Sequence, residues 1–182
     1  MTFSLLAVAV HVLDRSVAPG ITARVFTLGG HFSWLYPLDY LRLVAYPLGH
    51  SHWNHLLSNI PLILLLGAFV EDKYGSWDVL AMMAITAISA GLVNVVFFST
   101  GLRGASGLVY MLIVLASLGN FRRGELPLTF VLVAGFYLTA EVVAMTQPDQ
   151  IAQWGHIAGG VMGGVMGLWL GPEASRTPTR VR

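Results

Sequence analysis

Long stretches without a single charged residue constrain this chain more than any other feature of its sequence. A helix that crosses a bilayer needs about 20 mostly apolar residues, and each charge inside it costs a few kcal/mol. Cutting the sequence at its charges leaves five apolar windows: 43–70, 79–102, 104–121, 126–148 and 150–172. Only the fourth window contains a charge, that of Glu141. The pattern predicts five transmembrane helices.

The composition agrees with a membrane protein and excludes several other classes. Only 10% of the 182 residues are charged, against roughly 25% in a soluble domain, which must solvate its surface. The formal net charge of +1 gives no electrostatic basis for binding nucleic acid. The chain has no Cys, which excludes disulfides, thiolate metal sites and cysteine nucleophiles. We therefore expect an all-α, polytopic membrane protein.

The two ends of the chain are less apolar than its middle. Residues 1–17 are predicted to form a sixth helix, with Asp14 and Arg15 at the membrane interface. The long connection that follows is rich in aromatic residues and glycine, so we expect it to lie partly in the interface, where Trp and Tyr are favoured. The predicted six-helix domain covers residues 1–172, and residues 173–182 form a short polar tail.

Arginine and lysine in the short connections predict the orientation. With both termini in the cytoplasm, the inner side holds Lys73, Arg122, Arg123, Arg176, Arg180 and Arg182. The outer side holds Arg103 and the arginines of the long first loop. Cytoplasmic loops carry an excess of Lys and Arg, which favours this orientation in a cell membrane.

The sequence Gly104-Ala105-Ser106-Gly107 opens the third apolar window, 104–121. Glycines on both sides let the backbone turn sharply and let a neighbouring helix approach. A serine at a helix N-terminus has free backbone N–H groups beside it, which can stabilise an oxyanion. Serine is also a common helix N-cap, so this motif alone does not establish catalysis.

His156 lies near the start of the last apolar window. Glycine recurs there at every fourth residue, at positions 155, 159, 163, 167 and 171. Such a stripe permits close backbone contact with another helix, and it would hold the imidazole of His156 near that helix. A packing helix that merely carries a histidine is the alternative.

Three histidines, His50, His52 and His55, precede Asn59 in the first window, 43–70. No carboxylate follows them in the H-E-x-x-H pattern of zinc proteases, so we predict no metal site. His55 and Asn59 are four residues apart and therefore share one helix face. Both side chains can donate hydrogen bonds toward one point, as an oxyanion hole requires.

The three clusters lie at the same end of the predicted bundle. The second, fourth and sixth helices all begin on the outer side, and each cluster lies near the start of its helix. A serine needs a base before it can act as a nucleophile at neutral pH, and a histidine on a neighbouring helix can supply one. The agreement among three separate segments indicates one common site.

In this combination the chain resembles the rhomboid family of intramembrane serine proteases, over about residues 37–171. The family's G-x-S-G motif falls on Gly104 to Gly107, which makes Ser106 the implied nucleophile. Its histidine motif, H-x-x-G-x-x-x-G, falls on His156, Gly159 and Gly163.

The resemblance also implies roles for residues outside these two motifs. His55 and Asn59 match the family's oxyanion partners, and His50 matches a histidine often seen before them. Tyr110 matches the aromatic residue that packs against the catalytic imidazole. The family's Trp-Arg pair in the first loop is Leu41-Arg42 here, so only the arginine carries over.

The activity implied by the resemblance is that of a serine endopeptidase without a cofactor or metal. The sequence assigns no acid to His156, so we expect a dyad of Ser106 and His156 rather than a triad. The implied partners are the lipid bilayer and transmembrane protein substrates, which would be cut near the outer leaflet. The oligomeric state is not predicted.

Two other functions are compatible with parts of the sequence. A catalytically inactive rhomboid-like protein would bind membrane clients, but such relatives are expected to lack the serine or the histidine, and both are present here. A small transporter would use Glu141, Asn94 and the histidines to line a polar path. Glu141 is explained better by that function, unless it is an acid near a helix end that bonds to a polar neighbour.

Overall fold

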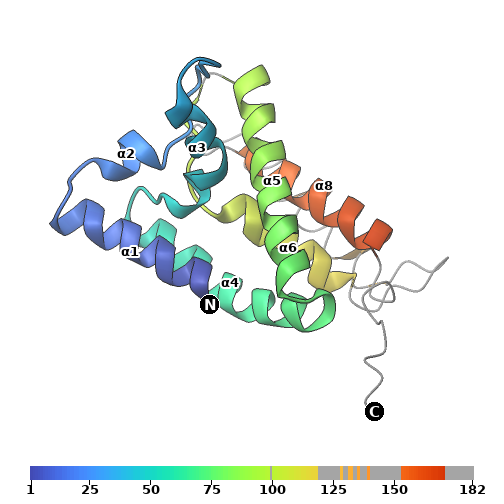
Figure 1. Ribbon diagram of the computed structural model, residues 1–182. Helices are drawn as coiled ribbons and strands as arrows, with labels where there is room; N and C mark the ends of the chain where they lie inside the picture. The colour runs from blue at the N-terminus through green and yellow to red at the C-terminus, as the bar shows by residue number, and fades with distance from the viewer. Residues whose placement is uncertain are drawn as a thin grey trace, which may run out of the picture.

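The computed structural model describes residues 1–98, 100–118 and 153–170, together with residues 128, 131, 132, 135 and 139. The described chain is helical apart from turns, loops and one isolated β-bridge (Figure 1). Most of the fourth apolar window, with Glu141, lies outside the described residues, and so does the tail 173–182.

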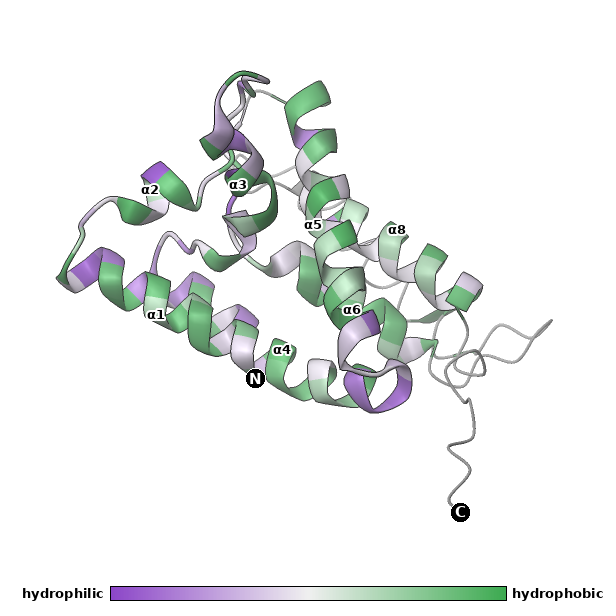
Figure 2. Cartoon of the chain, in the orientation of Figure 1, coloured by the Kyte–Doolittle hydropathy of each residue, from purple (hydrophilic) through white to green (hydrophobic). Residues whose placement is uncertain are grey.

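Eight helical segments are described. They are α1 (Thr2–Ser16), α2 (Ile21–Val25), α3 (Pro37–Ala45), the 3₁₀ helix η1 (Tyr46–Leu48), α4 (Trp53–Tyr74), α5 (Ser76–Phe97), α6 (Ser106–Ser117) and α8 (Gln153–Leu170). Within the described ranges, α4 and α5 are long and apolar enough to cross a membrane, and α6 is a shorter apolar helix. Figure 2 shows hydrophobic residues along most of α5 and hydrophilic ones at the turn between α4 and α5. The chain is therefore all-helical as expected, while the count of six membrane helices stays a prediction.

The first apolar window, 43–70, does not form one continuous helix. Its first residues complete α3, residues 46–48 form η1, and α4 begins only at Trp53. The break is local, because Pro47 has no backbone N–H to donate and Gly49 is extended, with φ −81° and ψ 133°. At its other end α4 continues through the charged residues 71–73 and ends at Tyr74, followed by Gly75, whose φ is +83°. The apolar window thus ends at Val70, whereas the helix continues to Tyr74.

The long first connection contains two helices, α2 and α3, that the sequence pattern did not predict. Asp39, in the first turn of α3, accepts a hydrogen bond from the Ser33 N–H at 2.9 Å and pairs with Arg42 at 2.7 Å. Burial raises the pKa of Asp39, but the bonds from Ser33 and Arg42 outweigh burial and leave that pKa below its usual value. Arg42, in α3, also donates to the carbonyl oxygen of Arg24 in α2. Arg42 therefore joins α2 to α3 and lies within the first connection.

Helix α6 packs against α4, α5 and α8, and its most extensive contact is with α8 (Figure 1). Its inward side chains are buried, among them Met111, Leu112 and Leu115. The segment before α6 is held by the first connection. Leu28 and Leu102 form an antiparallel bridge with N···O distances of 2.9 and 2.8 Å. The Gly104 N–H also donates to the carbonyl of Tyr46 at 3.1 Å, so the approach to Ser106 is fixed from two sides.

Candidate active site

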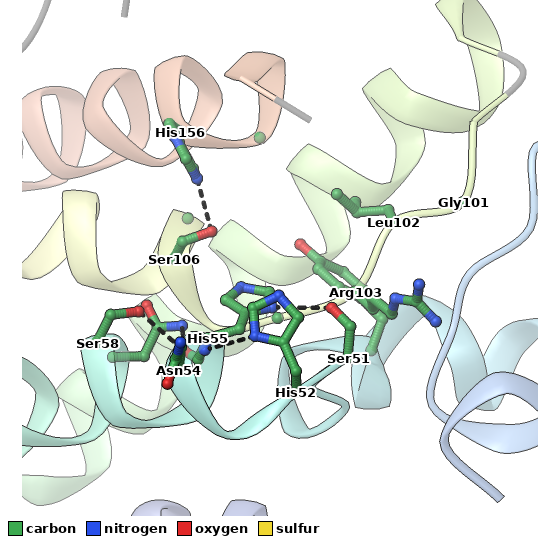
Figure 3. Close-up of a pocket in the computed structure, with 15 residues that line it drawn as sticks. Ser51, His52, Asn54, His55, Ser58, Gly101, Leu102, Arg103, Ser106 and His156 are labelled. Carbon is green, nitrogen blue, oxygen red and sulfur yellow. Dashed lines mark hydrogen bonds between the residues drawn. The ribbon is translucent and has the colours of Figure 1, made fainter. Parts of the chain in front are cut away.

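A pocket of about 440 Å³ lies where α4, α6 and α8 begin (Figure 3). Apart from Tyr46 of η1, its lining comes from three segments: residues between 51 and 59 before and within the start of α4, residues between 101 and 107 before and within the first turn of α6, and residues 155–156 of α8. The structure thus brings together three segments that are far apart in the sequence. Each segment carries one of the clusters that the sequence analysis singled out.

Ser106 and His156 face each other across this pocket. His156 Nε2 lies 2.7 Å from Ser106 Oγ, although 50 positions separate the two residues (Figure 3). This distance suits a nucleophile and its base. The ring of Tyr110, one turn after Ser106, stacks on His156 with centroids 4.6 Å apart and an interplanar angle of 7°. The stacking fixes the plane of the imidazole, so Nε2 is held toward the serine.

The backbones of α6 and α8 touch directly beside this pair. A Cβ on Gly159 would overlap the carbonyl oxygen of Gly107. A Cβ on Gly163 would lie 2.6 Å from the carbonyl oxygen of Met111, and one on Gly107 would lie 2.9 Å from that of Gly155. These separations leave no room for a side chain. The glycine stripe is therefore what allows the two helices to bring serine and histidine together.

Two donor groups lie on the other side of Ser106. As the first residue of α6, Ser106 has a backbone N–H without a partner inside its helix. The His55 ring faces Gly104, where a Cβ would lie 2.6 Å from Nε2. Gly104 has a φ of +107°, a conformation that only glycine adopts readily. The Oγ of Ser51 lies 3.3 Å from His55 Nδ1. A hydroxyl that donates to Nδ1 leaves the hydrogen on Nε2, which then faces the pocket.

Asn59 also lines the pocket, but its side chain is only 4% exposed. Its amide nitrogen donates to the carbonyl of His55 at 2.8 Å and lies 3.3 Å from His50 Nε2. Both amide hydrogens thus have acceptors within the protein. The longer contact, to His50, is the weaker of the two.

His50 lies behind the pocket, in the loop before α4, and is 1% exposed. Burial, with a further effect of nearby His55, lowers the pKa of His50 to about 4. The neutral ring can donate from Nδ1 to the Leu48 carbonyl at 3.3 Å and accept at Nε2. His50 therefore orients the Asn59 amide from behind, and it does not line the pocket.

Several polar residues of the lining were missed by the sequence analysis. They are Ser51, Asn54, Ser58 and Arg103, whose polar character beside the recognised motifs was the only available signal. His52 caps α4, because its Nδ1 accepts a hydrogen bond from the His55 N–H at 3.1 Å. In the described part of the chain, no three His, Cys, Asp or Glu side chains are grouped to hold a metal ion.

Comparison with known proteins gives this arrangement a family. Residues 37–173, which include all three segments of the pocket, match the Rhomboid domain. Rhomboid-like protein 11, chloroplastic, of Arabidopsis thaliana is 26% identical over 136 residues, which cover 66% of this chain and 49% of that protein. Rhomboid protease GlpG of Yersinia pestis (strain Pestoides F) is 22% identical over 187 residues, which cover 97% of this chain and 65% of that protein. The chain thus spans about half of the first of these curated relatives and just under two thirds of the second. By the match to most of its length, this chain belongs to the rhomboid family.

Proposed function

We propose that the protein is an intramembrane serine endopeptidase that cleaves transmembrane segments of other membrane proteins. The observation that carries this proposal is the 2.7 Å contact between His156 Nε2 and Ser106 Oγ in a polar pocket among apolar helices. Membership of a family whose relatives include proteins named rhomboid protease supports it.

In the proposed reaction Ser106 and His156 act as a dyad. The Ser106 hydroxyl gives its proton to Nε2 of neutral His156 while its oxygen attacks the carbonyl carbon of the scissile peptide bond. The protonated imidazole then gives this proton to the leaving amine, and the carbonyl stays on the serine as an acyl ester. Water then attacks the ester carbonyl and gives a proton to Nε2 of His156. The imidazolium returns this proton to Ser106 Oγ as the ester bond breaks, which releases the carboxylic acid and restores the serine.

The tetrahedral intermediates carry a negative oxygen that needs donors. Ser106 and His55 both line the pocket, so the backbone N–H of Ser106 and, in the tautomer with its hydrogen on Nε2, the His55 ring are the proposed donors. Asn59 would be a third donor, by exchanging its 3.3 Å contact with His50 for one to the oxyanion. The 2.8 Å bond to the His55 carbonyl would hold the amide during this exchange.

The position of the pocket supports a membrane-embedded substrate. We propose six membrane-spanning helices with both termini in the cytoplasm, which places the starts of α4, α6 and α8 on the outer side of a cell membrane. A substrate helix hides its carbonyls in its own hydrogen bonds, so a helix that unwinds near the outer leaflet would expose the scissile bond.

A fluorophosphonate probe tests the proposal, because it reacts with an activated serine. The purified protein should be labelled at Ser106, and mass spectrometry of the modified peptide identifies the site. It should also cut a transmembrane substrate in detergent or liposomes. Absence of both reactions would favour an inactive client-binding protein or a transporter. For the transporter, Asn94 gives little support, because its amide donates to the Thr100 carbonyl at 2.9 Å.

A further inference from the structure

Helix α1 contacts η1, α4 and the loop between them, although none of its residues lines the pocket. His11 and Arg15 are four residues apart and so lie on one face of α1. His11 Nδ1 lies 3.3 Å from the carbonyl oxygen of His50. Arg15 Nη2 donates to the next carbonyl, that of Ser51, at 2.7 Å. Two side chains of α1 thus hold two consecutive carbonyl groups.

The side chains of the same two loop residues contact the two oxyanion candidates of α4. Ser51 Oγ lies 3.3 Å from His55 Nδ1 (Figure 3). His50 Nε2 lies 3.3 Å from the amide nitrogen of Asn59. Two paths of contacts therefore lead from α1 to the pocket. One runs from His11 through His50 to Asn59, and the other from Arg15 through Ser51 to His55.

The hydrogen positions along these paths are consistent with two aligned donors. A carbonyl only accepts, so His11 must carry a hydrogen on Nδ1. His55 has its hydrogen on Nε2 when the Ser51 hydroxyl donates to Nδ1, and that tautomer is the one that can donate into the pocket. The position of Ser51 decides whether its hydroxyl reaches Nδ1, and Arg15 holds the backbone of Ser51.

His11 is a costly residue for packing alone. Its ring is 0% exposed and meets the edge of Trp53 with centroids 4.5 Å apart. Its Nε2 has no hydrogen-bond partner among the described residues. A buried nitrogen without a partner destabilises the fold, whereas a leucine of similar size would bury no polar group. The bond to the His50 carbonyl gives the histidine a role that leucine lacks.

We propose that His11 and Arg15 of α1 are positioning residues for the oxyanion side of the site. By holding the carbonyls of the loop before α4, they keep the imidazole of His55 and the amide of Asn59 in place. The inference rests on the proposed function. Interactions made mainly in the transition state affect kcat more than KM, so the loss should appear in kcat.

The first test removes and restores the hydrogen bond of Arg15. In Arg15→Met the aliphatic stem remains but the donor is lost, and we expect kcat to fall by about 10- to 100-fold with KM within about twofold. Arg15→Lys keeps a donor and should recover most of kcat. Val12→Ala, at an exposed position of the same helix, is the control and should behave like the unaltered protein. A normal kcat in Arg15→Met would overturn the proposal.

A double variant tests whether Arg15 acts through Ser51. Ser51→Ala removes the hydroxyl that contacts His55, so it should lower kcat at least as much as Arg15→Met. Combining the two should cost little beyond Ser51→Ala alone, because both changes interrupt one path. Losses in kcat that multiply fully would show that Arg15 acts by another route and would overturn this part.

His11→Leu separates positioning from a structural role. We expect kcat to fall about 10-fold or more while the thermal stability in detergent is unchanged or higher, since the unpaired nitrogen is gone. His11→Asn keeps an N–H donor and should recover part of kcat. A loss of kcat that follows a loss of stability, without rescue by Asn, would assign His11 to the fold alone.

A measurement without turnover distinguishes failure of this inference from failure of the proposed function. Nitrogen NMR of ¹⁵N-histidine in the inactive Ser106→Ala protein reports the tautomer of His55. We expect the Nε2–H form, and a mixture of tautomers when Arg15→Met is added. An unchanged tautomer together with an unchanged kcat overturns the inference alone. An unaltered protein that neither labels at Ser106 nor cleaves overturns the proposed function, and the catalytic part of the inference with it.

Discussion

Gly159 and Gly107 touch through their backbones, so closely that a Cβ on Gly159 would overlap the carbonyl oxygen of Gly107. His156 lies three residues before Gly159 and therefore on the same side of α8. Its Nε2 meets Ser106 Oγ at 2.7 Å. Because both side chains are short, this distance depends on the separation of the two helices. The glycine contact therefore sets the geometry of the proposed dyad.

A single methyl group should be enough to break this geometry. In Gly159→Ala the new Cβ meets backbone atoms of Gly107. Unlike a side chain, this backbone cannot rotate away, so α8 must move away from α6. Even a 1 Å displacement of a catalytic group can cost about 100-fold in rate, and we expect at least this loss in kcat.

The neighbouring glycine provides the matched control. In Gly160→Ala the nearest atom to the new Cβ is Val114 Cγ2 at 3.9 Å, an ordinary van der Waals contact. This variant should keep near-normal cleavage, and both variants should insert into membranes equally. Cleavage and membrane fractionation measure the two properties. Normal activity in Gly159→Ala would show that the contact between α6 and α8 does not control the reaction.

Ser106 and His156 are expected to act as one unit. Ser106→Ala, His156→Ala and the double variant should all reduce cleavage to a similar floor, because removing either member disables the same proton transfer. Residual rates of a transmembrane substrate at high enzyme concentration measure this floor. Substantial turnover by purified Ser106→Ala protein, or a double variant far below both single ones, would contradict the assignment.

The pairing of these two residues was accessible from the sequence because both lie in short motifs at the same end of the predicted bundle, and these motifs together resemble those of the rhomboid family. The G-x-S-G and H-x-x-G-x-x-x-G motifs each occupy one helix start, and Tyr110 follows Ser106 by one turn. Gly159 and Gly163, which allow the approach, follow His156 by three and seven residues and therefore lie on the same face of the helix. A regular helix therefore turns a local pattern into the three-dimensional arrangement.

The supports of the site were not accessible in this way. His11 and Arg15 bind backbone carbonyls, which every residue has, so no side-chain pattern marks their partners. The sequence also did not predict α2 and α3, whose residues are held by contacts such as Arg42 with the Arg24 carbonyl. The break before α4 was not predicted either, because the residues before Trp53 carry no formal charge and so continue the same window.

Asn59→Ala tests the third oxyanion donor. Loss of one such donor typically lowers kcat by about 10²- to 10³-fold while the others remain. The variant should be slow in cleavage but should still react with a fluorophosphonate at Ser106, since the dyad is intact.

Asn94→Ala is the matched control for Asn59→Ala. Asn94 is a similarly buried amide, 5% exposed, that bonds the Thr100 carbonyl and does not line the pocket. Its loss should lower the thermal stability and leave the kcat of the folded protein nearly unchanged. If Asn59→Ala instead loses labelling and stability together, Asn59 has a structural role.

The last prediction concerns the dependence of stability on pH. Burial, with a further effect of nearby His55, lowers the pKa of His50 in the loop before α4 to about 4, whereas an imidazole in an unfolded chain has a pKa of about 6.5. Between these values the unfolded chain binds a proton that the folded protein does not, so the free energy of unfolding falls as the pH falls through this range. At full extent the loss is on the order of 3 kcal/mol.

Unfolding temperatures in detergent at pH 7 and pH 5 should therefore differ clearly, and the difference should shrink in His50→Gln, which cannot titrate. His31→Gln, at an exposed position, should keep the pH dependence of the unaltered protein. An equal pH dependence in His50→Gln would show that His50 is not the group whose protonation opposes folding.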